Sequence, residues 1–160
     1  MDDLDPRHRT SAGAAAHPDP PPPELTDRPL SDKDYQALSR FRHALRVFLR
    51  FSEDAARAAE VTPAHHQLML AVKGWPGPAA PSVAELAERL QLKHNSTVEL
   101  VQRAAAAGLV HSEANPTDRR EHLTSLTERG ERILASLSLL HRDELRRFRS
   151  EMNEVLRELD

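Results

Sequence analysis

The fold is decided by residues 82–126, which read SVAELAERLQLKHNSTVELVQRAAAAGLVHSEANPTDRREHLTSL. Ser82 and Glu85 have the spacing of a capping box, in which each side chain bonds the other residue's backbone N–H, so a helix is predicted to begin here. Apolar residues at helical spacing then predict two short helices. The second helix is expected to end near Gly108, because glycine tolerates the positive φ that often follows a helix end.

A short hairpin is predicted after the second helix. Leu109 and Val110 begin its first strand, and residues 123–126 form its second strand. Residues 115–118 (NPTD) connect the strands and are rich in residues that favour turns. The segment as a whole therefore predicts two helices followed by a two-stranded ribbon with an exposed tip.

The second helix is predicted to present a polar face. Its apolar positions Val98, Val101 and Ala105 repeat at helical period and are expected to be buried. The remaining side chains are mostly short or able to form hydrogen bonds: His94, Asn95, Ser96, Thr97, Glu99, Gln102 and Arg103. A helix that enters the major groove of DNA needs such a face, because base edges offer hydrogen-bond donors and acceptors. We therefore expect these side chains to face the major groove.

Two arginines, Arg119 and Arg120, follow the turn of the hairpin. Arginine suits a narrow, electronegative minor groove. We expect both side chains to contact the minor groove or its phosphates. Lys93 and Ser82, which precede the two helices, are expected to contact the DNA backbone and position the protein on it.

Acidic residues of this segment balance its basic ones. Between positions 91 and 122 the basic residues Lys93, Arg103, Arg119 and Arg120 are matched by the acidic residues Glu99, Glu113, Asp118 and Glu121. A DNA-binding interpretation therefore depends on the order of the motifs rather than on bulk positive charge. Asp118 is interpreted as a wing brace that holds Arg120 or Arg103 in place by a charge-assisted hydrogen bond.

Five short motifs occur in a characteristic order: Glu85-Leu86-Ala87, Ser96-Thr97-Val98, Gly108-Leu109-Val110, Asp118-Arg119-Arg120 and Leu126-Thr127-x-x-Gly130. In these motifs the chain resembles the multiple-antibiotic-resistance regulator (MarR) family of winged helix-turn-helix transcription factors. The resemblance covers about residues 31–158. It implies a mainly α fold with a small β-hairpin wing, in which N- and C-terminal helices form a dimerisation platform.

Long amphipathic helices are predicted on both sides of this segment. Ser31 is a plausible cap for a helix over residues 31–59, whose apolar stripe is broader than one small core requires. The C-terminal region repeats apolar residues at spacings of three and four, which is typical of a helix that pairs with another helix. Thr127 is expected to cap this last helix, and Thr62 with Pro63 predicts the start of another. These apolar stripes are compatible with packing within one chain and with a helical bundle formed between two subunits.

The chain is predicted to contain one folded domain. More than half of its 12 prolines lie in residues 1–30, which are expected to form a disordered or extended arm. Residues 31–160 are assigned to a single domain. Within it, residues 31–61 and 128–160 are expected to be dimerisation helices, and residues 62–127 the DNA-binding lobe.

Composition excludes several classes of function. The chain has no cysteine, which excludes disulfides, thiolate metal sites and cysteine redox sensing. No apolar run is long enough to cross a bilayer, and the N-terminus lacks the apolar core of a signal peptide, so we expect a cytoplasmic bacterial protein. Neither a Gly-rich phosphate loop nor a nucleophile elbow is present, and we expect no enzymatic activity and no cofactor.

The predicted function is that of a DNA-binding transcriptional regulator. The chain would bind a pseudo-palindromic operator as a homodimer and act as a ligand-responsive repressor. The resemblance implies a small anionic aromatic effector in a cleft between the two lobes. From helix position alone, the expected lining residues of that cleft are Tyr35, His43, Arg46, His65 and Trp75.

Two other functions are kept as alternatives. A winged helix could serve as a protein-interaction or scaffold module without reading DNA, as the balanced charge and His111-Ser112 suggest. A metal-responsive regulator is the second alternative, since the chain has nine histidines and places His141 and Glu144 three residues apart. A third ligand is not evident near them in sequence, so no metal site is assigned.

Overall fold

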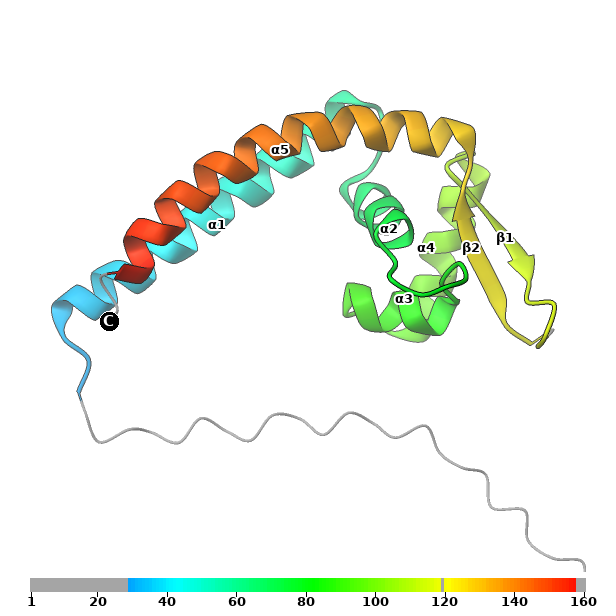
Figure 1. Ribbon diagram of the computed structural model, residues 1–160, viewed down its shortest axis with the longest axis horizontal. Coiled ribbons are helices and arrows are strands. Elements are labelled where there is room, and N and C mark those ends of the chain that lie inside the picture. The colour runs from blue at the N-terminus through cyan, green and yellow to red at the C-terminus, as the bar shows by residue number, and fades with distance from the viewer. Residues whose placement is uncertain (1–28, 119, 158–160) are drawn as a thin grey trace, which may run out of the picture.

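The computed structural model describes residues 29–118 and 120–157 (Figure 1). In chain order the elements are α1 (Asp32–Ala58), α2 (Pro63–Lys73), α3 (Val83–Leu90), α4 (His94–Ala106), β1 (Val110–Ala114), β2 (His122–Leu126) and α5 (Glu128–Arg157). This mainly α architecture with one antiparallel hairpin confirms the predicted fold class. The predicted N-terminal arm lies, except for its last two residues, outside the described residues.

Helices α1 and α5 run antiparallel and side by side (Figure 1). Where the N-terminal half of α1 meets the C-terminal end of α5, Ala37 and Ala44 are buried against Met152 and Val155. The small alanine side chains let the two helix axes approach closely. The predicted C-terminal seam is therefore used, at these positions, for packing within the chain.

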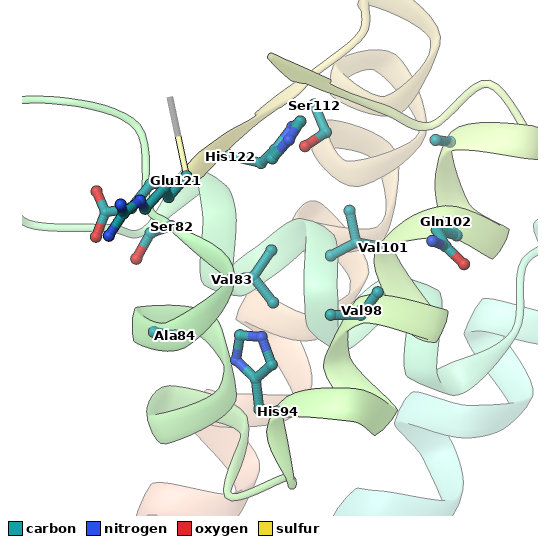
Figure 2. Close-up of a pocket in the computed structure, with 12 residues that line it drawn as sticks. Ser82, Val83, Ala84, His94, Val98, Val101, Gln102, Ser112, Glu121 and His122 are labelled. Atoms are coloured by element: carbon teal, nitrogen blue, oxygen red, sulfur yellow. The ribbon is translucent and has the colours of Figure 1, made fainter. Parts of the chain in front are cut away.

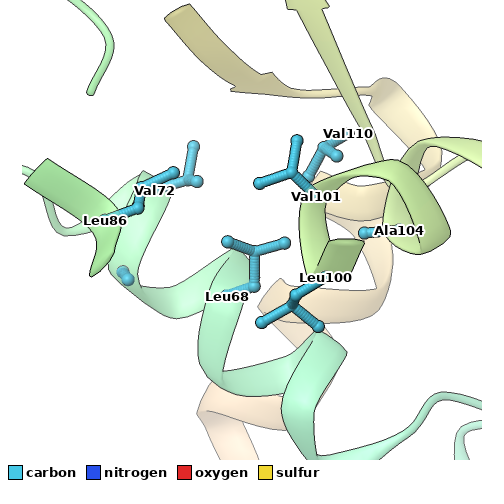
Figure 3. Close-up of a cluster of buried hydrophobic side chains, with 8 residues drawn as sticks. Leu68, Val72, Leu86, Leu100, Val101, Ala104 and Val110 are labelled. Carbon is cyan, nitrogen blue, oxygen red and sulfur yellow. The ribbon is translucent and has the colours of Figure 1, made fainter. Parts of the chain in front are cut away.

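The other helices and the hairpin form a separate lobe beside one end of this helix pair (Figure 1). Its core joins α2, α3, α4 and β1 (Figure 3), through Leu68, Ala71, Val72, Leu86, Leu100, Val101, Ala104 and Val110. Leu68 and Leu86 are fully buried. The predicted capping box starts α3, since the Ser82 hydroxyl accepts from the Glu85 N–H at 3.3 Å and the Glu85 carboxylate accepts from the Ser82 N–H at 2.7 Å.

The lobe is attached to the helix pair through a second core. Met69 of α2 and Leu109, which precedes β1, pack with Leu134 and Leu137 of α5. The predicted cap of α5 is confirmed: the Thr127 hydroxyl oxygen lies 3.0 Å from the Gly130 N–H donor nitrogen and 2.7 Å from the Gly108 carbonyl oxygen. This hydroxyl therefore ties the turn after α4 to the first turn of α5.

The hairpin pairs β1 with β2 in register from Val110 opposite Leu126 to Ala114 opposite His122. Gly108 has φ of 68°, as expected for the residue that turns the chain from α4 into the strand. Among the described residues, no helix combines the length and apolarity that a membrane span requires.

Candidate nucleic-acid interface

Helix α4 exposes one polar face to solvent. The side chains of six residues predicted to face outward are exposed: His94, Asn95, Ser96, Glu99, Gln102 and Arg103. Arg103 lies 3.6 Å from Glu99, one helical turn earlier, so part of its charge is balanced on the same face. Lys93 precedes the helix and is exposed as well.

The prediction that Thr97 faces outward is wrong. Its side chain is 0% exposed, and its hydroxyl donates to the Lys93 carbonyl oxygen at 3.1 Å. Leu100 and Ala104, at three and seven residues further on, are buried on the same face. Val98 is instead only half-buried and Ala105 is exposed, so the buried face is rotated by about one residue from the predicted one.

Ser82 also differs from the prediction. It is 7% exposed, and its hydroxyl and backbone N–H are both bonded to Glu85 within the capping box. Burial, rather than the cap, limits its contact with a phosphate, because a hydroxyl that accepts in a cap still has its O–H to donate. Of the two residues expected to position the DNA backbone, Lys93 alone has its side chain available.

The tip of the hairpin is organised by side-chain bonds to backbone and neighbouring residues. Asn115 Oδ1 accepts from the Thr117 N–H at 3.0 Å, and Asn115 Nδ2 donates to Glu121 at 3.0 Å. Asp118 Oδ1 accepts from the Arg120 backbone N–H at 3.0 Å. Asp118 therefore braces the tip as predicted, but through the backbone of Arg120 rather than through a guanidinium group.

The two predicted wing arginines differ in what can be stated of them. Arg120 is exposed at the tip of the hairpin. Arg119 lies outside the described residues. Arg103, the other predicted partner of Asp118, is paired with Glu99 instead.

A groove of about 450 Å³ separates α4 from the start of α3 and from the hairpin. Figure 2 shows Val83 of α3 and Val98 of α4 facing one another across it, with His94 at one end and His122 at the other. Arg120 also lines this groove. From the polar face of α4 the groove takes in His94 and Gln102, and it brings them to one concave surface with Arg120 of the hairpin.

A second cavity, of about 540 Å³, lies between α1, α2 and α5. Apolar side chains line much of it: Phe48, Leu49, Leu70 and Leu145. Three arginines of α5 also line it, namely Arg142, Arg146 and Arg149. Its remaining polar side chains include Ser52, His66 and His141.

The predicted ligand cleft is not formed by the residues assigned to it. Tyr35, His43, Arg46 and His65 do not line the cavity between α1, α2 and α5, and Trp75 lines a different, smaller cavity beside the α2–α3 loop. On a helix, neighbouring residues point about 100° apart, so His66 rather than His65 reaches the cavity. Burial first, and then the Arg103 guanidinium, lower the pKa of His65.

His66 and His141 meet at the wall of this cavity. Their ring centroids lie 4.7 Å apart, and both side chains are buried. His141 Nδ1 lies 2.7 Å from the Leu137 carbonyl oxygen, and its Nε2 lies 2.8 Å from Ser52 Oγ. Because a carbonyl can only accept, Nδ1–H donates to Leu137, and in the neutral ring Nε2 accepts from the Ser52 hydroxyl. Burial, and secondarily His141, lower the pKa of His66.

The proposed metal pair of His141 and Glu144 is occupied by other contacts. Both ring nitrogens of His141 are hydrogen-bonded, and Glu144 lies 3.4 Å from Arg147. Within residues 29–118 and 120–157, no three potential ligands of the His, Asp or Glu type gather in a metal-binding arrangement. The described residues therefore give the metal-responsive alternative no support.

Comparisons with known proteins point in one direction. The model of the MarR family matches residues 59–121. The fold is similar to that of AbsC, a MarR family transcriptional regulator from Streptomyces coelicolor, with a TM-score of 0.67, 22% identity, and coverage of 83% of this chain and 90% of AbsC. It is also similar to the MarR family regulator SP03579, with a TM-score of 0.63, 27% identity, and coverage of 73% and 76%.

A third solved structure includes nucleic acid. A mutant of MepR from Staphylococcus aureus, bound to an oligodeoxyribonucleotide, superposes with a TM-score of 0.58 and 15% identity, covering 77% of this chain and 90% of MepR. No curated protein matches the chain by sequence. The solved structures identify the arrangement of α3, α4 and the hairpin as a winged helix-turn-helix.

Proposed function

We propose that the chain is a transcriptional regulator of the MarR family, whose model matches residues 59–121, and that it binds an operator in double-stranded DNA as a homodimer. The observation that carries this proposal is the placement of His94 and Gln102, from the exposed polar face of α4, around one groove with Arg120 of the hairpin. The proposal assigns the chain no catalytic role.

Base reading is assigned to α4. Its exposed face offers amide, hydroxyl, imidazole and guanidinium groups, which are the types that bond base edges in a major groove. Asn95 and Gln102 suit bidentate bonds to adenine, and Arg103 suits guanine once its pairing with Glu99 is released. Lys93 would contact a phosphate, and Arg120 would reach the minor groove or its phosphates, with Arg119 as a further candidate.

Dimerisation is assigned to α1 and α5. Tyr35 of α1 is 60% exposed, and Leu139 and Leu140 of α5 are 58% and 55% exposed. Large apolar side chains on a helix pair favour burial against a partner, and a second copy of the chain presents the same surface. Two lobes related by a two-fold axis would then read half-sites about 10 base pairs apart, in a pseudo-palindrome.

Effector binding is assigned to the cavity between α1, α2 and α5. Its apolar lining suits the ring of an aromatic compound, and the arginines of α5 suit a carboxylate or another anionic group. The cavity touches α2 of the lobe and both helices of the pair, so a bound ligand could change the spacing of the two recognition helices. Repression relieved by such a ligand is therefore the proposed mode of control.

The test of DNA reading is a mobility-shift assay with the DNA upstream of the chain's own coding sequence, at two salt concentrations. Specific binding that weakens steeply as salt rises would support phosphate and base contacts by the helix and the wing. A scrambled duplex of the same length is the control. Sedimentation of the free protein tests the dimer, and a monomer would contradict the paired-lobe arrangement.

A scaffold module without DNA reading is the second candidate. The Glu99–Arg103 pair on the outward face and the balanced charge of the segment favour it. This candidate predicts no shift of any duplex even at low salt, whereas the regulator predicts a shift that the scrambled duplex does not reproduce.

A further inference from the structure

The ring of His66 has no hydrogen-bond partner in the described part of the chain, although the residue as a whole is largely buried. The residue is 4% exposed, and in the described part of the chain no hydrogen bond reaches its ring nitrogens. Neither ring nitrogen is a fully buried atom, and His66 lines the cavity between α1, α2 and α5. The ring nitrogens are therefore open to a molecule inside that cavity.

His141 cannot easily serve as that polar contact. Its two ring nitrogens are held by Leu137 and Ser52, which keeps the ring in one tautomer and one orientation. The edges of Phe48 and Phe51 pack near it at centroid distances of 6.3 and 5.6 Å. His141 is thus a fixed neighbour, and His66 is the member of the pair that is open to a proton or a ligand.

The charged groups that line the cavity all have the same sign. Helix α1 contributes no charged side chain to the lining, and α2 contributes His66 beside the neutral Gln67. Helix α5 contributes His141 and three arginines: Arg142, Arg146 and Arg149. No Asp or Glu lines the cavity, and Asp143, which pairs with two of the arginines from outside the lining, lies 3.4 Å from Arg146 and 3.9 Å from Arg142. An anion is therefore the ligand that these groups favour.

An anion and a proton would each promote the binding of the other. With the cavity empty, burial and the neighbouring His141 lower the pKa of His66, so the ring is neutral at neutral pH. A carboxylate beside the ring favours the imidazolium and raises the pKa of His66 again. Reciprocity of linked equilibria then requires that protonation strengthen carboxylate binding by the same factor.

We propose that this cavity captures an aromatic carboxylate together with one proton, which is taken up from solvent by the imidazole of His66. The proposal rests on the effector role assigned to the cavity above, and it adds how that site is regulated. Binding breaks no covalent bond; the proton becomes the N–H that donates to the carboxylate. Effector affinity would then rise as pH falls towards the pKa of His66 in the free protein.

The experiment is calorimetric titration of the full-length protein with benzoate at pH 8, 7 and 6, in two buffers that differ in ionisation enthalpy. Benzoate stays ionised over this range, and neutral benzamide is the matched control. If bound benzoate raises the pKa of His66 by one unit, the affinity for benzoate can rise about tenfold from high to low pH. We expect at least about a tenfold gain for benzoate, with net proton uptake, and no gain for benzamide.

Two variants separate the roles of the cavity residues. His66→Gln keeps a polar side chain without a titrating group, so benzoate binding should persist while its pH dependence and proton uptake disappear. Arg149→Ala should weaken benzoate binding at every pH and keep the pH dependence. Should His66→Gln fail to fold, NMR of the wild-type histidine rings gives the same answer, because benzoate must move the titration of His66 to higher pH.

Three results would overturn the proposal. They are benzoate affinity that does not change with pH, an unaltered pH dependence in His66→Gln, and absence of saturable benzoate binding at pH 6. DNA is absent from all of these measurements. Failure here therefore leaves operator reading untouched, and failure of operator reading in the mobility-shift assay leaves this result standing.

Discussion

The backbone of Gly130, in the first turn of α5, lies directly against the carbonyl group of Leu109, which follows the turn after α4. A Cβ at position 130 would overlap the Leu109 carbonyl oxygen and crowd its carbonyl carbon. The close approach places the first turn of α5 against the end of α4. It explains why the motif over residues 126–130 ends in a glycine.

Gly130→Ala should destabilise the protein. Alanine gains about 1 kcal/mol of helix propensity over glycine, but the methyl group must displace backbone rather than a flexible side chain. Overpacking of this kind costs about 1–3 kcal/mol or more, and we expect a net loss of about 2 kcal/mol in chemical denaturation. Gly108→Ala is the control, since its added Cβ has 3.8 Å to the nearest side chain but a φ of 68°. A loss at position 130 no larger than at position 108 would contradict the backbone clash.

Thr97 and Gln102 should respond oppositely to substitution. Thr97→Val keeps the buried volume and removes the hydroxyl that bonds the Lys93 carbonyl, which costs about 0.5–1.5 kcal/mol of stability. Its effect on DNA affinity should be small because the side chain is buried. Gln102→Ala should leave stability within about 0.5 kcal/mol and weaken operator binding by about 1–3 kcal/mol if the amide reads a base. Thermal unfolding and fluorescence anisotropy on both variants check this, and the reverse pattern would refute the assigned face of α4.

Arg120→Ala should weaken DNA binding without changing the dimer. Loss of one phosphate contact lowers affinity for all duplexes by similar factors and reduces the slope of log affinity against log salt by about 1. The measurement is anisotropy on operator and scrambled duplexes at several salt concentrations. An unchanged slope would show that this side chain does not contact the phosphates.

Asp118 offers a test of how the wing is braced. Because its carboxylate accepts from the Arg120 backbone N–H, Asp118→Asn retains an acceptor oxygen and should keep DNA affinity close to that of wild type. Asp118→Ala removes the acceptor and should weaken binding. Equal losses in the two variants would indicate instead that the negative charge itself, acting on a guanidinium group, is what matters.

Stability should fall in mild acid because of His66. In the folded chain the pKa of His66 lies below the ordinary histidine value of 6.5, chiefly through burial. The unfolded chain therefore binds the proton first, so this contribution is fully present above pH 6.5 and is lost as pH falls through the folded pKa. The midpoint of thermal unfolding between pH 7.5 and 5 should fall less in His66→Gln than in wild type. His43→Gln, at an exposed position, should behave like wild type, and equal slopes in all three proteins would exclude His66 as the cause.

Local signals predicted the elements accurately. The caps at Ser31, Thr62, Ser82 and Thr127 were each expected and each is present, as a hydroxyl that accepts from the backbone N–H three residues later. Capping depends on residues only a few positions apart, so it can be predicted without knowledge of the rest of the fold. The same holds for the turn at Gly108.

Faces and cavities were predicted less well. The helical period alone does not decide which of two adjacent stripes of α4 is buried. One stripe contains Val98 and Ala105, the other contains Leu100 and Ala104, and both are apolar. The buried face became clear only where Leu68 of α2 packs against α4. The presence of Leu100 four residues before Ala104 was the signal that could have identified it.

Sequence alone determined the order of the helices, their caps, the hairpin and the family, because each of these depends on short-range patterns of side chains. Tertiary packing alone decided that Thr97 is buried and that His66 rather than His65 joins His141 at a cavity. The first outcome depends on how α4 packs with α2 and α3, and the second on which faces of α1, α2 and α5 meet. That choice is made by the fit of side chains more than a hundred positions apart in some pairs, such as Ala37 and Met152, and no local pattern encodes it.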